Sequence, residues 1–172
     1  IETLTNRRIG KYDEGNNWVW GGYNALGQLV TYEDVSLRSG ITTTTYRSAS
    51  EYSIEGQLAY YKEDITSSAA PDLKTTIYTG ATGIDNENNP QKSALGYAVL
   101  GRLKKSEEFR IELDTAQSEK LKAGTRITKT IAAFDADGTN AIGAGYNDKG
   151  QASSYLEIRD MQGQSITQEF KH

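Results

Sequence analysis

The sequence predicts an all-β fold, an antiparallel β-sandwich or jelly-roll-like domain with about nine to eleven strands and at most one short helix. Three observations support this prediction. Apolar and polar residues alternate along residues 52–61 and 107–113, as they do in half-buried strands. Segments rich in Thr, Val, Ile and Tyr recur between turns rich in Gly and Asn. The hydrophobic fraction of 36% is below the usual average, which favours a thin core between two layers.

Residues 107–134 contain the clearest strand signals of the chain. The alternating residues at the start form one strand, a polar segment at 114–122 follows, and the Ala-Gly pair at 123–124 is the turn signal. Residues 125–134 are rich in β-branched side chains and form the returning strand. We therefore expect two strands that pair across one tight turn or a single helical turn near Ser118.

The other elements are predicted from the same kinds of pattern. Residues 1–16 are polar and are expected to form either a strand that pairs with the sheet or a loose terminal arm. Residues 17–35 have the composition of a β-hairpin, and Gly56 inside the alternating segment 52–61 indicates a bulge or a close neighbour. Further strands are expected at residues 42–46, 73–79, 94–103, 154–160 and 165–170, and exposed loops at residues 66–72, 80–93 and 135–150.

Length and charge narrow the classes of protein that fit. The 172 residues predict a single domain over residues 1–172, in which residues 1–15 are a donor strand or arm, and no internal repeat is convincing. Without cysteine the chain has no disulfide, thiolate nucleophile or cysteine-based zinc site. The net charge of −4 comes from well-mixed charges with no basic stripe, so we expect no nucleic-acid partner.

Composition also bears on location. No apolar run approaches the ~20 residues that a membrane-spanning helix needs, so no membrane insertion is expected. Thr, Ser, Asn and Gly are abundant, and there are 11 Tyr and one Met. This composition favours a secreted protein that acts outside the cell or at the cell surface.

Catalysis is not expected from the residues present. The only histidine, His172, is the last residue of the sequence, so a Ser-His-Asp arrangement is nearly excluded. Pairs of acidic residues could serve a glycosidase, but neighbours in a strand point to opposite faces and do not converge. We therefore expect no enzyme activity and no required cofactor. The pairs are Glu33 with Asp34, Glu63 with Asp64, and Glu107 with Glu108.

One acidic loop suggests a calcium site. Asp135, Asp137 and Thr139 occupy alternate positions around Gly138, and Asp148 follows in the same glycine-rich loop. Calcium is bound by several oxygen ligands at close range, which flexible loops can supply. The alternative is a plain Asp-Gly turn that binds no ion. If calcium binds, we expect it to rigidify the loops.

Three aromatic residues suggest a ligand surface. Trp18 and Trp20 are two residues apart, so in a strand both rings lie on one face, and Tyr23 follows closely. Exposed aromatic faces can stack on the C–H faces of sugars, which would make this a carbohydrate-binding module. The alternative is that the tryptophans fill the core, where large aromatic side chains usually lie. The sequence leaves both interpretations open.

The two terminal strands suggest assembly. Open sheets have unpaired edges that soluble monomers protect, and both prolines of this chain lie in predicted loops. The leading hypothesis is a non-enzymatic subunit of a surface filament or adhesin that polymerises with copies of itself by strand donation from residues 1–9, with Ile1, Leu4 and Ile9 as the assembly strand. In a monomer, by contrast, these termini would pair within their own sheet. Surface glycans are the expected partner in the carbohydrate-binding alternative, and a viral or phage coat or decoration protein is a further alternative.

Overall fold

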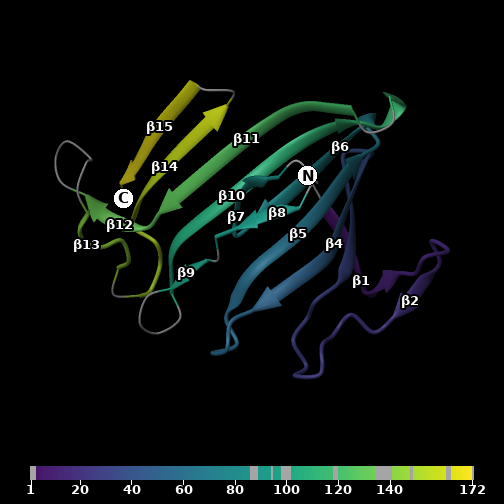
Figure 1. Ribbon diagram of the computed structural model, residues 1–172, viewed down its shortest axis with the longest axis horizontal. Coiled ribbons are helices and arrows are strands. Elements are labelled where there is room, and N and C mark those ends of the chain that lie inside the picture. The colour runs from purple at the N-terminus through teal and green to yellow at the C-terminus, as the bar shows by residue number, and fades with distance from the viewer. Residues whose placement is uncertain are drawn as a thin grey trace. The chain divides into compact units, whose positions relative to one another are not determined.

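The computed structural model describes residues 3–85, 89–93, 95–97, 102–117, 120–134, 141–147, 149–161 and 164–171 (Figure 1). The chain divides into two compact units. Unit 1 contains Ile1–Tyr78 and Ile111–Ala123, and unit 2 contains Thr79–Arg110 and Gly124–His172. The strands β10 (Leu103–Asp114) and β11 (Lys120–Thr130) each contribute residues to both units. The single domain expected from the chain length therefore stays a prediction.

Unit 1 is built on an antiparallel sheet. Its strands follow the order β6-β5-β4-β3-β1-β2, and nearly every strand lies beside its neighbour in the sequence (Figure 1). Such an up-and-down arrangement needs only short connections. The strands are β1 (Thr3–Tyr12), β2 (Trp18–Trp20), β3 (Tyr32–Arg38), β4 (Ile41–Tyr52), β5 (Leu58–Ser67) and β6 (Ala70–Thr79).

Unit 2 has a second run of antiparallel strands in the order β15-β14-β11-β10, in which β9 also pairs with β10. Two small two-stranded sheets, β7 with β8 and β12 with β13, belong to the same unit. A 3-10 turn occupies Thr115–Gln117 between β10 and β11. The strands are β7 (Ala81–Ile84), β8 (Pro90–Lys92), β9 (Gly96–Tyr97), β10 (Leu103–Asp114), β11 (Lys120–Thr130), β12 (Ala132–Phe134), β13 (Ala141–Ala144), β14 (Ser154–Met161) and β15 (Gln164–Lys171).

The predicted fold class is confirmed. The described residues are nearly all antiparallel sheet, which is consistent with a sandwich-like, all-β fold. Nine of the strands have seven or more residues, within the expected nine to eleven, and six shorter strands of two to four residues add to them. The 3-10 turn lies next to Ser118, where a single helical turn was expected.

Two of the predicted turns and strands are corrected by the structure. Gly124 lies inside β11 and does not form the turn between β10 and β11. A Cβ at this position would be 3.3 Å from Cζ of Phe109. This glycine is therefore explained by the close ring. The alternating segment 52–61 is not one strand but the end of β4, a turn at residues 53–57 and the start of β5. Gly56 has a φ of +78°, which a strand interior does not adopt.

Loops and hairpins also differ from expectation in detail. Residues 17–35 do not form a simple hairpin, because β2 pairs with β1. The expected loop at residues 66–72 is mostly strand, since β5 continues to Ser67 and β6 begins at Ala70. The expected loop at residues 80–93 contains the paired strands β7 and β8.

A turn of one kind recurs through the chain, although no repeat was convincing in the sequence. We call each example a Tyr-turn. Its first residue is Tyr, its second is Asp, Asn or Ser, and its sixth is Asn or Gln. Its fifth residue has a positive φ. The second residue accepts a backbone hydrogen bond from the fifth and donates one to the sixth, and the first and seventh residues pair across the turn. The Tyr-turns are residues 12–18, 23–29, 52–58 and 146–152, and the positive φ values are 59° at Asn16, 74° at Gly27, 78° at Gly56 and 77° at Gly150.

The buried core is small and rich in tyrosine, as a thin core requires. In unit 1 the rings of Tyr32, Tyr60 and Tyr78 are at most 8% exposed. In unit 2 the buried apolar residues include Ile131 and Ala132.

Within the described residues, no helix is long and apolar enough to cross a membrane.

Candidate functional site

Strand β1 is part of its own sheet and is not a detached arm. Residues 3–9 pair with β3 in seven consecutive antiparallel pairs without a register shift, and residues 10–12 pair with β2. Of the two alternatives for residues 1–15, a pairing strand or a loose arm, these pairings support the strand for residues 3–12. The described pairings place no strand on the other edge of Thr3–Ile9, so this stretch is a sheet edge, as predicted for the first strand. Ile1 lies outside the described residues.

The second half of β1 is held by charged groups. The guanidinium of Arg7 donates to both carboxylate oxygens of Asp34 at 2.7 and 2.6 Å, and this hydrogen bond raises the pKa of Arg7. Nε of Arg8 donates to Oε1 of Glu33 at 2.7 Å, and the hydroxyl of Tyr12 donates to Oε2 of Glu33 at 2.7 Å. Both arginine side chains therefore fold back onto β3.

The first half of β1 is uncharged and displays an apolar side chain. Leu4 is 59% exposed and pairs with Leu37 of β3, which is 46% exposed. The two leucines line a shallow depression together with Ser39 and Gly40. Ile9, the third predicted assembly residue, is half-buried. The devices that protect natural edges, which are Lys, Pro and bulges, are absent from Thr3–Asn6.

The interior of the same sheet is held by stacked arginines and tyrosines. The ring of Tyr32 lies between two guanidinium groups, with Cζ of Arg7 4.2 Å and Cζ of Arg47 4.9 Å from its centre. Arg47 also lies 3.8 Å from the ring centre of Tyr61 and donates to Oε1 of Glu63 at 2.7 Å. The Tyr32 hydroxyl donates to the same carboxylate oxygen at 3.2 Å, and burial raises the pKa of Tyr32. These contacts join four strands across one face.

The two tryptophans have different environments. Trp18 is half-buried, and its ring packs edge-on against Tyr12 at 5.1 Å and Tyr46 at 6.4 Å between ring centres. The guanidinium of Arg8 lies 4.1 Å from the centre of the Trp18 ring. Trp20 is 74% exposed and touches Trp18 edge-on, with 6.3 Å between ring centres. Trp18 is therefore part of the packing, and Trp20 is on the surface.

Tyr23 completes the predicted aromatic group only in part. It is 54% exposed and is the first residue of the second Tyr-turn, where it pairs with Leu29. No ring contact joins Tyr23 to either tryptophan among the described residues. Of the three aromatic residues, Trp20 is thus the most exposed, and its ring contact is with Trp18.

The predicted calcium ligands Asp135, Asp137, Thr139 and Asp148 lie outside the described residues. The neighbouring Asn147 is described, and its Oδ1 accepts the backbone N–H groups of Lys149 and Gln151 at 3.0 Å each. In the part of the chain that the structure describes, no group of three or more His, Cys, Asp or Glu side chains is placed to hold a metal. Calcium binding stays a prediction.

Adjacent carboxylates diverge, as the strand geometry predicts. Glu33 and Asp34 bind different arginines, as described above. Glu63 binds Arg47, whereas Asp64 accepts a hydrogen bond from the hydroxyl of Thr76 at 2.6 Å. Glu107 is 6% exposed and accepts from Arg126, whereas Glu108 accepts from Arg110. Each carboxylate is therefore engaged by its own partner.

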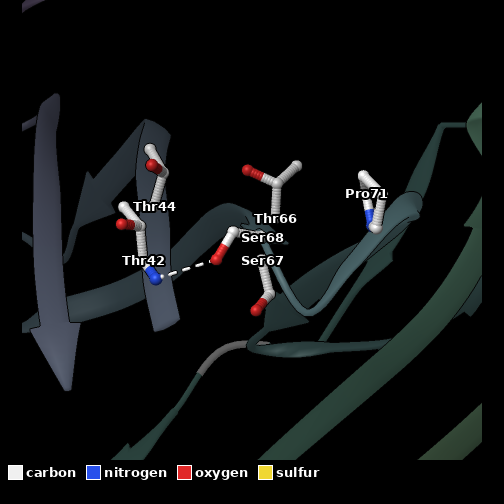
Figure 2. Close-up of a pocket in the computed structure, with 6 residues that line it drawn as sticks. All are labelled: Thr42, Thr44, Thr66, Ser67, Ser68 and Pro71. Carbon is white, nitrogen blue, oxygen red and sulfur yellow. Dashed lines mark hydrogen bonds between the residues drawn. The ribbon is translucent and has the colours of Figure 1, made fainter. Parts of the chain in front are cut away.

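A hydroxyl-rich pocket was not predicted from the sequence. It has a volume of about 380 Å³ and opens at one end of the β4–β5 pair (Figure 2). Oγ of Ser68 accepts the backbone N–H of Thr42 at 3.0 Å, which holds the turn after β5 against β4. Its lining offers hydroxyls without a base to activate them. The only signal in the sequence is the run of hydroxyl residues in both strands. The lining residues are Thr42, Thr44, Thr66, Ser67, Ser68 and Pro71.

Comparison of the chain with protein-family models, with curated proteins and with solved structures finds no match. Among the described residues, two surface features are open to a partner: the uncharged edge of β1 with Leu4 exposed, and the exposed ring of Trp20.

Proposed function

We propose that this chain is a non-enzymatic structural subunit of an extracellular filament or adhesin at a cell surface. The subunits assemble with copies of themselves by β-strand pairing. The observation that carries the proposal is the edge formed by Thr3–Ile9, which pairs with β3 on one side only among the described pairings. In this version of the hypothesis, β1 stays in its own sheet and offers its free edge to a strand of another copy. A regular row of unpaired N–H and C=O groups is a template for such pairing.

The distribution of charge along β1 supports this use of the edge. The positive charge on Lys11 lies outside Thr3–Ile9, in the part of β1 that pairs with β2, and the other two positive charges of the strand, on Arg7 and Arg8, are paired with Asp34 and Glu33 of the same sheet. They therefore do not repel an incoming strand as a free lysine would. Leu4 and Leu37 add apolar surface beside the edge, which an added strand would cover.

The test is a pair of charge substitutions, Leu4→Lys and Leu37→Lys, measured by sedimentation velocity and negative-stain electron microscopy over a range of protein concentrations. The two leucines face each other on adjacent strands and are both exposed, but only Leu4 is on the edge strand. We expect the wild-type chain to form concentration-dependent assemblies. Leu4→Lys should reduce the association constant at least tenfold, and Leu37→Lys should reduce it much less.

Two results would contradict the proposal. A wild-type chain that stays monomeric at all concentrations would exclude assembly by copies of this chain alone. Equal losses in the two variants would show that copies meet through the leucine-bearing face and not through the edge. A far-ultraviolet circular dichroism spectrum of each variant checks that the sheet is intact.

A second candidate function is favoured by one observation, the 74% exposure of Trp20. Burial of such a ring against a ligand is favourable, and indole faces bind the C–H faces of sugars. A glycan array followed by titration of any hit tests it. Trp20→Ala should abolish binding, whereas Val19→Ala, which changes the neighbouring residue of β2, should not. Binding that survives Trp20→Ala would exclude this surface as the glycan site.

A further inference from the structure

We infer that the free edge of β1 pairs with β15 of a second copy in an antiparallel arrangement that places Leu4 opposite Ile166. This inference rests on the proposed function and names the partner segment and the register. The last strand is the natural counterpart of the first because it is the other edge of the chain's sheet pairings. Strand β15 ends the strand order and pairs with β14 only among the described pairings.

The two edges are alike in the features that decide pairing. Strand β15 pairs with β14 in eight consecutive pairs without a register shift, so it is as regular as β1. Ile166 is 48% exposed, and Leu4 is 59% exposed. Each is therefore an apolar side chain that a partner strand could cover. Apolar side chains directly opposite each other on paired strands stabilise a sheet.

The register follows from matching the uncharged parts of the two edges. With Leu4 opposite Ile166, Thr3 is opposite Thr167 and Asn6 is opposite Gln164, and the segments in contact carry no charged side chain. Moving the strands by two residues places Leu4 opposite Gln164 or Gln168. A one-residue move puts Leu4 and Ile166 on opposite faces of the sheet. Only the first register places the two apolar side chains directly opposite each other on the same face.

The pairing of two different strands has a consequence for the assembly. When β1 of one copy meets β15 of the next, each copy retains one free β1 edge or one free β15 edge, so growth continues into an open fibre or a ring. Pairing of β1 with β1 would be isologous and would stop at a dimer. The inferred contact is therefore the one that can build a filament.

The chain lacks cysteine, so introduced cysteines report the register directly. The test variant is Thr3→Cys with Thr167→Cys, and the matched control is Thr5→Cys with Thr167→Cys. All three threonines are exposed. Directly opposite Cβ atoms lie about 4.5–5.5 Å apart and diagonal ones about 7–8 Å. A disulfide needs Cβ atoms about 3.5–4.5 Å apart, so only the opposite pair is close to this geometry.

Under mild oxidation we expect the test variant to form a ladder of covalent multimers on a non-reducing gel, at least fivefold more than the control. A mixture of Thr3→Cys copies and Thr167→Cys copies should give heterodimers and nothing larger. Dimers of Thr3→Cys alone would show that β1 pairs with β1 and would overturn the inference. A cross-linked monomer of the test variant would show pairing within one chain and would also overturn it.

Sedimentation of the same samples separates the inference from the proposed function. Assembly that proceeds without cross-links, or with equal cross-links in the control, would overturn the register but leave strand-edge assembly standing. If the wild-type chain and both variants stay monomeric, the proposed function fails, and the register fails with it.

Discussion

The interior of the unit 1 sheet and its β1 edge are built in different ways. In the interior, the ring of Tyr32 contacts the guanidinium groups of Arg7 and Arg47, and each arginine donates hydrogen bonds to a carboxylate. At the edge, Thr3–Asn6 have no charged side chain, and the apolar Leu4 is exposed. The interior uses cross-strand contacts where a thicker protein would use a large hydrophobic core. At the edge, Thr3–Asn6 make no charged or aromatic contact of this kind, and Leu4 is paired with the exposed Leu37.

The boundary between the two regions falls inside one strand. In β1, side-chain hydrogen bonds fix Arg7, Arg8 and Tyr12, whereas Thr3–Asn6 have no charged or aromatic side chain. A strand that served only its own sheet would gain from cross-strand contacts along its whole length. The difference teaches that stability and surface display are assigned to separate halves of the same strand.

The largest effect is expected from Tyr32→Ala, which removes the central ring of the interior. The ring is 7% exposed, and truncation of such a buried aromatic costs about 3–5 kcal/mol in the free energy of unfolding. Urea denaturation measures it. The edge control is Leu4→Ala, for which the 59% exposure predicts a loss below about 1 kcal/mol. Similar losses in both variants would remove the distinction between interior and edge.

A smaller effect is expected from alkaline pH, which tests the buried tyrosines of the interior. Burial raises the pKa of Tyr60 to about 12, with smaller contributions from Tyr78 and Glu51. Its pKa in the unfolded chain is about 10. The neutral phenol is thus favoured in the folded state, so stability is full below about pH 10 and is lost as the pH rises toward 12. Thermal melts should show this loss, and Tyr60→Phe should flatten it.

A matched control for the alkaline effect is Tyr23→Phe. Tyr23 is 54% exposed, so its substitution controls for the loss of a tyrosine hydroxyl outside the core. If Tyr60→Phe melts with the same pH dependence as the wild-type chain, the interior tyrosines do not control alkaline unfolding. Tyr32 and Tyr78 also have raised pKa values because of burial, so the slope in Tyr60→Phe should fall without vanishing.

The smallest effect concerns the turns that join the interior strands. Gly56→Ala should cost about 1 kcal/mol, because its φ of +78° is strained for a residue with a Cβ. Gly56→Asn should cost less, because the Tyr-turn at residues 12–18 has Asn16 in the same position with a φ of 59°. Chemical denaturation of the three proteins gives the order. An Asn variant no more stable than the Ala variant would show that the Tyr-turns are not equivalent.

Strands were predictable where the local pattern and the final pairing agree. Phe109, Ile111 and Leu113 alternate with polar residues and lie in β10, and the last two predicted strands match β14 and β15. Divergence of adjacent carboxylates also followed from the strand period alone. These features depend on the few nearest residues of the chain, so no knowledge of distant contacts was needed.

Other features were decided by contacts between distant residues. Residues 52–61 alternate as a strand would, but a Tyr-turn interrupts them, and its first residue, Tyr52, donates its hydroxyl to the backbone carbonyl of Leu29, 23 residues away. The exposure of Trp20 and the partial burial of Trp18 depend on Arg8, Tyr12 and Tyr46, which come from other strands. A two-residue spacing places both rings on one face, but it does not say what covers that face.

By itself, the sequence determined the all-β class, the position of most long strands and the absence of disulfides, since these follow from residue type and periodicity. The tertiary structure alone decided that β1 is a paired edge and not a free arm, because seven partners on β3 lie 23 to 35 residues away in sequence. It also decided which arginines are paired with carboxylates and which leucines stay exposed. Those outcomes depend on register, and register is a property of two strands together.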